Sequence, residues 1–286
     1  MAEPKVGPES VLIEVKAVSV NPVDWQTAAG LLDSRFDVHF PVIPGWDVAG
    51  VVSRVGPTVR EFGPGDEVFA YVRRDEIGAG TFAERVAAPV RTVARKPAGL
   101  SWEQAAAVPV AGLTAYQALD GVSGGDTVLV QAAAGGVGGF AVQLARLRGA
   151  RVIGTASSRN HPYLRGLGAE PVVYGPGLEG RVRELAPEGV SVVLDMYGGA
   201  DLREAVRLLT PQGWAVSLAD DGIRELGGRF VFARPSADDL EELGRLLGEG
   251  LLVPEVAWVL PLDQAAEAFE LSRAGHVRGK IVLTTG

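Results

Sequence analysis

The sequence predicts an α/β protein of two domains, a small β-barrel followed by a doubly wound parallel sheet. Up to residue 97, short apolar segments alternate with Pro/Gly turns, which is typical of a barrel. From residue 98 onwards, apolar strand segments alternate with amphipathic helical ones, as in a parallel sheet with crossover helices. Within that second part, a buried strand enters a run of small residues and leaves as a helix (residues 128–145).

Composition limits the possible functions. The 286 residues suffice for two domains with filled cores, and the net charge of -8 argues against a nucleic-acid partner. The chain contains no cysteine, which excludes disulfides, thiolate nucleophiles and cysteine-ligated metals. No apolar run approaches the ~20 residues of a membrane span, and no signal segment opens the chain. We therefore expect a cytoplasmic protein without a membrane partner.

The barrel is predicted from strands at 11–20, 48–55 and 67–72, with one or two more within 81–93. Asn21-Pro22-Val23-Asp24 follows the first strand and predicts a turn.

The second domain opens with a capping-box pattern at Ser101–Gln104, followed by an Ala-rich helix and a second helix near 114–119. A charged amphipathic helix at 238–249 ends it. We predict a barrel domain at 1–97, completed by a returning tail at 250–286, and a parallel-sheet domain at 98–249. Its alternating strands and helices are predicted at 127–132, 137–148, 151–156, 161–167, 171–174, 178–186, 190–196, 201–209, 213–218 and 229–233.

The glycine-rich turn predicts a dinucleotide site. Small residues between strand and helix let backbone N–H groups approach a pyrophosphate at the positive end of the helix dipole. The alternative is a tight turn that only packs helix against strand, but the strand–turn–helix context is the one that the motif requires. The residues expected to touch the cofactor here are Ala134, Gly135, Gly136, Val137 and Gly138.

The segment after the next strand indicates which dinucleotide is bound. NAD sites usually place a carboxylate there, to accept a hydrogen bond from the ribose 2′-hydroxyl. This chain has no carboxylate at that point, and instead has Ser157, Ser158 and Arg159, which suit a 2′-phosphate. We therefore expect NADPH as the cofactor. The alternative is that the serines only cap the next helix and that Arg159 is solvated.

Several motifs together resemble the medium-chain dehydrogenase/reductase superfamily, in its zinc-free quinone oxidoreductase (ζ-crystallin-like) branch. They cover almost the whole chain in the family's order. The resemblance implies a GroES-like catalytic barrel and a Rossmann domain, with NADPH in the cleft between them. The matching segments are 21–24, 45–52, 63–68, 80–84, 111–115, the glycine-rich turn and 275–280.

The resemblance also implies roles for single residues. Asn21 matches a cleft asparagine near the nicotinamide, and Thr114 matches a position near the reactive end of the cofactor. Tyr174 matches a tyrosine beside the adenosine 2′-phosphate, and Phe232 lies in a strand segment whose backbone meets the carboxamide. Three of the four have a plainer alternative: a turn Asn for Asn21, a helix-capping hydroxyl for Thr114 and a core aromatic for Phe232. His161 stands where many relatives have a phosphate-binding Lys, which leaves that role to Arg159.

The residues present argue against a catalytic zinc. Zinc-dependent relatives carry a Gly-His-Glu motif where this chain has Gly45-Trp46-Asp47, and a catalytic zinc needs three protein ligands. The three histidines, His39, His161 and His276, are widely separated in the sequence. We therefore expect no metal site.

The expected function is an NADPH-dependent, zinc-independent reductase that transfers hydride to quinones or α,β-unsaturated carbonyls, which are small electrophilic acceptors that need no Lewis acid. Gln26 stands where many quinone reductases have a substrate-site Tyr, so enones stay open as acceptors. The alternatives are an enoyl-thioester reductase of the same superfamily and a non-catalytic NADPH-binding sensor. The resemblance further implies a homodimer that pairs through the last Rossmann strand, at 229–233.

Overall fold

The computed structural model describes residues 3–286, which divide into two compact units. The barrel unit comprises Met1–Leu113 and Pro235–Gly286, and the Rossmann unit comprises Thr114–Arg234. Within the described residues, no helix has the length and apolar character needed to cross a membrane.

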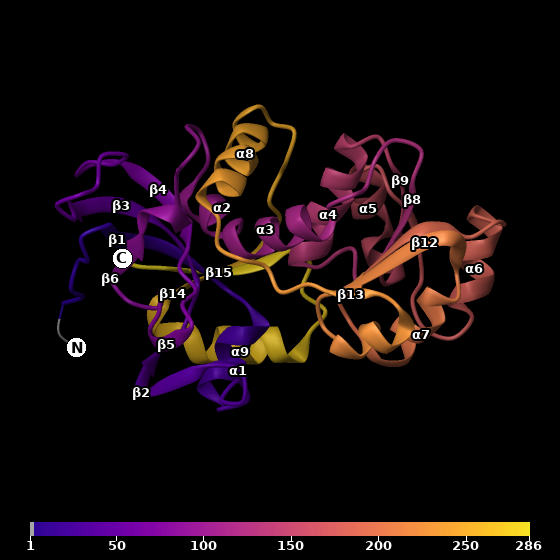
Figure 1. Cartoon of the computed structure of the whole chain (residues 1–286), viewed down its shortest axis with the longest axis horizontal. Coiled ribbons are helices and arrows are strands. Elements are labelled where there is room, and N and C mark those ends of the chain that lie inside the picture. Colours follow the sequence, from indigo (N-terminus) through magenta and orange to yellow (C-terminus); the bar gives the residue numbers. More distant parts are fainter. Residues whose placement is uncertain (1–2) are drawn as a thin grey trace. The chain divides into compact units, whose positions relative to one another are not determined.

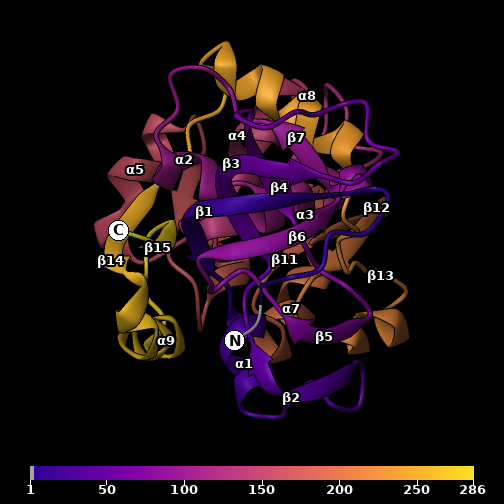
Figure 2. The same cartoon turned by 90° about the vertical axis from the view of Figure 1, so that its left-hand side faces the viewer.

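The barrel unit is organised around one sheet with strand order β14-β15-β1-β3-β4-β7, in which β6 also pairs with β1. All neighbours are antiparallel except β14 and β15, which run parallel. Strands β1, β3, β4 and β6 lie side by side in Figure 2. The strands of this sheet are β1 (Ser10–Val20), β3 (Asp47–Val55), β4 (Glu67–Tyr71), β6 (Arg85–Pro89), β7 (Val93–Arg95), β14 (Val256–Pro261) and β15 (Lys280–Thr284).

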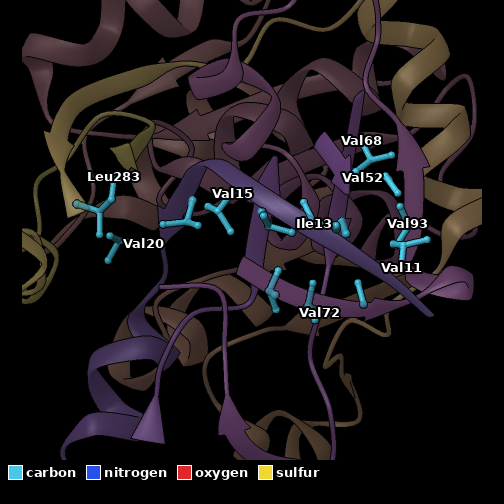
Figure 3. Packing of buried hydrophobic residues seen from close by; sticks show 14 of the residues in the cluster. Val11, Ile13, Val15, Val20, Val52, Val68, Val72, Val93 and Leu283 are labelled. Carbon is cyan, nitrogen blue, oxygen red and sulfur yellow. The ribbon is translucent and has the colours of Figure 1, made fainter. Parts of the chain in front are cut away.

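Strand β1 is the centre of this unit because it pairs with β3, β6 and β15. Its β-branched side chains Val11, Ile13 and Val15 are buried in one apolar cluster with residues of β3, β4 and β15 (Figure 3). The pairing of β1 with β15 brings residues 280–284 of the tail into the sheet that residues 10–20 begin.

The segment after β1 corrects one sequence prediction. Asn21–Asp24 was predicted as a turn, but it begins the helix α1 (Pro22–Ala28). Asn21 is the N-cap and Pro22 occupies the first helical position, where its missing N–H and fixed φ cost nothing. A two-stranded sheet of β2 (Asp37–Ile43) and β5 (Glu76–Ala79), which the sequence did not predict, completes this region.

Three further helices belong to the barrel unit: α2 (Trp102–Ala106), α8 (Ala237–Gly248) and α9 (Ala265–Ala274). The sequence prediction placed α2 and α8 in the second domain. The structure packs α2 on β1 and β3, and α8 on β7. A Cβ added at Gly244 of α8 would lie in van der Waals contact with Phe69 and Pro97, 3.6 Å from each. These apolar contacts are the reason why the two units divide near residues 113 and 235.

The Rossmann unit contains a six-stranded sheet, all parallel, in the order β10-β9-β8-β11-β12-β13. The chain moves outward from β8 to β10 and then returns to β11 on the other side of β8. Dinucleotides bind at such a switch point, outside the carboxyl ends of the strands. The strands are β8 (Thr127–Val130), β9 (Arg151–Thr155), β10 (Glu170–Val172), β11 (Val190–Asp195), β12 (Leu209–Ser217) and β13 (Arg229–Phe230).

Helices connect these strands as the alternation predicted (Figure 1). The last strand is shorter than expected: it ends at Phe230, although Val231 N still donates to the Ser217 carbonyl of β12 (3.0 Å). The helices are α4 (Gly136–Leu147), α5 (His161–Gly166), α6 (Leu178–Leu185) and α7 (Gly199–Val206), and α3 (Pro109–Ala118) precedes β8.

Candidate functional site

The glycine-rich turn lies at the carboxyl end of β8, the first strand at the switch point. Thr155, at the end of neighbouring β9, holds the turn through two hydrogen bonds: its Oγ1 accepts from Ala132 N (3.0 Å) and its carbonyl from Ala133 N (2.9 Å). Ala132 itself has a φ of 51°, which is unusual for a residue with a side chain and reverses the chain direction at this point. These two hydrogen bonds therefore tie the turn to the end of β9.

Gly138 allows the first turn of α4 to lie directly against this turn. A Cβ at residue 138 would lie 2.4 Å from the Ala132 oxygen and 2.6 Å from the Ala133 Cα, both of which are backbone atoms. The first helical hydrogen bond runs from Gly139 N to the N-cap Gly135 (2.9 Å). The N–H groups of residues 136–138 therefore have no partner within the helix.

This arrangement fits a pyrophosphate. Three N–H groups at the start of a twelve-residue helix form an anion site, and no acidic side chain lies in its first turn. The predicted residues Gly135, Gly136, Val137 and Gly138 lie at this helix start, and Ala134 immediately precedes it.

The segment after β9 carries the residues predicted for the 2′-phosphate. Ser157 is the N-cap of a short 3-10 helix (Ser158–Asn160), in which Ser158 and Arg159 are exposed. Tyr174 follows β10 and is 44% exposed. Arg181, which the sequence reasoning missed, holds the Tyr174 loop by donating to the carbonyls of Val173 (2.9 Å) and Gly175 (2.9 Å), among others. In the sequence, the only indication of this role is that an Arg occurs in the first turn of the helix that follows the loop.

For Thr114 the structure excludes the plainer alternative, and for Phe232 it corrects the expected strand. Thr114 is inside α3 and mostly buried, so it does not cap a helix. Phe232 is half-buried, two residues beyond the end of β13, so it is not part of a paired strand.

In the barrel unit, Asn21 lies in a buried cluster of charged groups. Its side-chain Nδ2 donates to Asp47 Oδ2 (2.8 Å), and its Oδ1 accepts from Lys280 Nζ (2.6 Å). Its backbone N–H donates to Asp24 Oδ2 (2.7 Å). Ser19 Oγ also donates to Asp47 Oδ2 (2.5 Å). All five residues are almost completely buried.

Burial perturbs every charge in this cluster. Desolvation raises the pKa of Asp24 to about 7, against the hydrogen bond that it accepts from Asn21. Burial also raises the pKa of Asp47 and lowers that of Lys280, although each charge favours the other. Asp47 accepts hydrogen bonds from Ser19, Asn21 and the Val110 backbone (2.6 Å), whereas Asp24 Oδ1 has no partner. We therefore assign the negative charge to Asp47 and the proton to Asp24.

Sequence reasoning missed this cluster. Asp24, Asp47 and Lys280 lie in segments that carried the family resemblance, but no role was predicted for them. A signal was present: Asp47 precedes the apolar run of β3 and Lys280 that of β15, where ionised side chains are rare unless paired.

The residues that the structure describes contain no group of three or more His, Cys, Asp and Glu side chains that could hold a metal ion. Trp46, which the resemblance matches to a zinc-binding His, is buried, and the ring centroids of Phe36 and Tyr71 each lie 6.0 Å from its own. This position is therefore apolar.

Comparison with known proteins agrees with this architecture. Residues 7–98 match the family described as alcohol dehydrogenase GroES-like domain, and residues 167–283 match the family described as zinc-binding dehydrogenase. A GroES-like barrel joined to a Rossmann sheet defines the class of protein as an oxidoreductase of the alcohol dehydrogenase type.

The relatives narrow this class. The chain is 32% identical to a chloroplast envelope quinone oxidoreductase homologue of Arabidopsis thaliana, over 96% of this chain and 89% of the relative. It is 33% identical to an NADPH-dependent alkenal/one oxidoreductase of the same plant, over 98% and 73%. The solved quinone oxidoreductase of Coxiella burnetii has a TM-score of 0.86 at 33% identity, over 99% and 93% of the two chains. The chain belongs to the medium-chain dehydrogenase/reductase superfamily, in its quinone oxidoreductase branch.

Proposed function

We propose that this protein is an NADPH-dependent, zinc-independent reductase that transfers hydride to quinones or α,β-unsaturated carbonyls. The observation that carries the proposal is the glycine-rich turn at the switch point, followed after the next strand by Ser157, Ser158 and Arg159 in place of a carboxylate. The relatives whose names include quinone or alkenal/one oxidoreductase support the same reaction class.

The nicotinamide of NADPH supplies the hydride when it is bound. The residues of this chain bind and orient that cofactor. The N–H groups of residues 136–138 bind the pyrophosphate, and the guanidinium of Arg159 pairs with the 2′-phosphate, which NADH lacks. Tyr174, held in its loop by Arg181, lies against the adenosine, and the backbone at Phe232 meets the carboxamide.

Thr114 and Asn21 are proposed for the reacting end, as hydrogen-bond donors to the nicotinamide or to an acceptor oxygen. Neither is an acid or a base at neutral pH, and their contribution is orientation and stabilisation of developing negative charge. Quinones and enones are already electrophilic, so this role requires no Lewis acid from the protein.

The test is the loss of NADPH absorbance with a panel of quinones, enones, enoyl thioesters and, as controls, saturated ketones. We expect turnover with quinones or enones and none with saturated ketones. Exclusive turnover of enoyl thioesters would favour an enoyl-thioester reductase. Tight NADPH binding with no turnover of any acceptor would favour a non-catalytic NADPH-binding protein.

We also propose a homodimer formed through the outer edge of β13, which in the described residues pairs only with β12. Light scattering at micromolar concentration tests this proposal, and a monomer mass would contradict it.

A further inference from the structure

The carboxamide of Asn21 lies between two opposite charges. Its oxygen accepts from the Lys280 ammonium (2.6 Å), and its nitrogen donates to the Asp47 carboxylate (2.8 Å). Oxygen and nitrogen of an Asn side chain have nearly the same shape, so an amide is held in one orientation only by its partners. Here a flipped amide would turn its oxygen toward the carboxylate and its N–H groups toward the ammonium.

Both charges are themselves held in place. Lys280 Nζ donates to the Val20 carbonyl (2.8 Å) and lies 3.7 Å from Asp47 Oδ2. Asp47 accepts from Ser19 Oγ (2.5 Å) through the same oxygen that Asn21 uses, and from Val110 N (2.6 Å) through the other. The two charges are therefore fixed by β1, β3, β15 and the start of α3, and water has almost no access to either.

We infer that Lys280 and Asp47 are positioning residues for Asn21, which lock its carboxamide so that the remaining side-chain N–H points in one constant direction. This inference rests on the proposed function only where it concerns turnover. The locked orientation is a property of the barrel unit itself. Charge-assisted hydrogen bonds at both ends of one buried amide are stronger than neutral ones, and they make the flipped state costly.

The first experiment needs no turnover. The chain contains two asparagines, Asn21 and Asn160, so Asn-selective ¹⁵N labelling yields two side-chain NH₂ signals. Asn160 is only half-buried, and its Nδ2 donates to Ser157 Oγ at 3.4 Å, so it serves as an internal control. We expect hydrogen exchange of the Asn21 side chain to be slower than that of Asn160 by about 100-fold or more. Equal exchange rates in the wild-type protein would overturn the inference.

The second experiment removes one charge. In Lys280→Met we expect the Asn21 signals to shift and to exchange faster, while the Asn160 signals stay unchanged. Unchanged Asn21 signals in the folded variant would overturn the inference. Lys96→Met is the matched control, because Lys96 is equally buried in the same unit and its amine donates to the Leu100 carbonyl (2.9 Å). If Lys280→Met does not fold, Asp47→Leu removes the other charge without adding a third asparagine and provides the same measurement.

The third experiment is a double-mutant cycle on NADPH oxidation. We expect Asn21→Ala and Lys280→Met each to lower kcat/KM on the order of 10- to 100-fold, and the double variant to lose no more than either. Lys96→Met should retain wild-type turnover. Losses that multiply in the double variant would show that Lys280 does not act through Asn21. If the wild-type protein turns over no acceptor and the labelling results still hold, the proposed function fails and the positioning of Asn21 stands.

Discussion

Replacing Asp24 by Asn should remove one cause of instability at neutral pH, namely the ionisation of the buried Asp24 carboxyl in the folded protein. Asp24 is 1% exposed, and its Oδ2 accepts from the Asn21 backbone N–H. Its other oxygen has no partner, and burial raises its pKa to about 7. An Asn at this position keeps the shape and the accepted hydrogen bond but carries no charge at any pH.

The magnitude follows from linkage. In the unfolded chain the Asp24 carboxyl titrates near its ordinary value of 3.8, and in the folded protein near 7. Between these values the folded state binds the extra proton, so the free energy of unfolding falls as pH rises. At 1.36 kcal/mol for each pH unit, the rise in pKa corresponds to about 4 kcal/mol. The contribution of protonated Asp24 to the free energy of unfolding is fully present below about pH 4 and is lost above about pH 7.

The assay is urea unfolding followed by tryptophan fluorescence at pH values from 4 to 8.5. Four of the five tryptophans lie in the barrel unit, so a Trp214→Phe background makes the signal report that unit alone. We expect the difference in unfolding free energy between Asp24→Asn and wild type to grow in favour of the variant by about 4 kcal/mol across this range. Asp33→Asn, an exposed carboxyl in the same unit, is the control for simple loss of a charge. A difference that stays constant with pH would refute the assignment of the proton to Asp24.

Three further outcomes are expected. Arg159→Ala should weaken NADPH binding about 10- to 100-fold in a fluorescence titration and leave NADH binding unchanged, and equal losses for both would contradict the role of Arg159. Gly138→Ala should abolish NADPH binding because its Cβ would overlap the Ala132 backbone, whereas Gly180→Ala, with nothing within 4 Å, should bind normally and melt no lower than wild type. Dialysis against a metal chelator should leave NADPH oxidation unchanged, and a loss that zinc restores would show a metal requirement.

The sequence predicted those parts of the fold that are encoded locally. Strand β1, the glycine-rich turn and the alternation from β8 to β12 were found close to their predicted bounds, because apolar periodicity and turn residues lie within a few positions of each other. The segment Asn21–Asp24 misled because Asn and Pro favour a turn and a helix start equally. Strand β2 is mostly exposed and shows no alternation, so no local pattern identified it.

The position of the glycine-rich turn at the start of α4 could be predicted because its residues are consecutive, from Ala134 to Gly138. Its binding of NADPH stays a proposal. The charged cluster of the barrel unit could not, because Asp24, Asp47 and Lys280 meet only through the pairing of β1 with β3 and β15. The protonation states of Asp24 and Asp47 were assigned from the number of hydrogen-bond donors around each carboxylate. Those donors are known only from the three-dimensional structure.

The position of Lys280 in the chain has a consequence for protein synthesis. The Rossmann unit is one continuous segment that is synthesised before residues 235–286. The barrel unit, although its first residues are made earliest, has no Lys280 counter-charge for Asp47 and no β15 beside β1 until residues 280–284 have been translated. We therefore expect the nascent chain to complete the Rossmann unit first, and Asn21 to take its final orientation only when β15 joins the sheet.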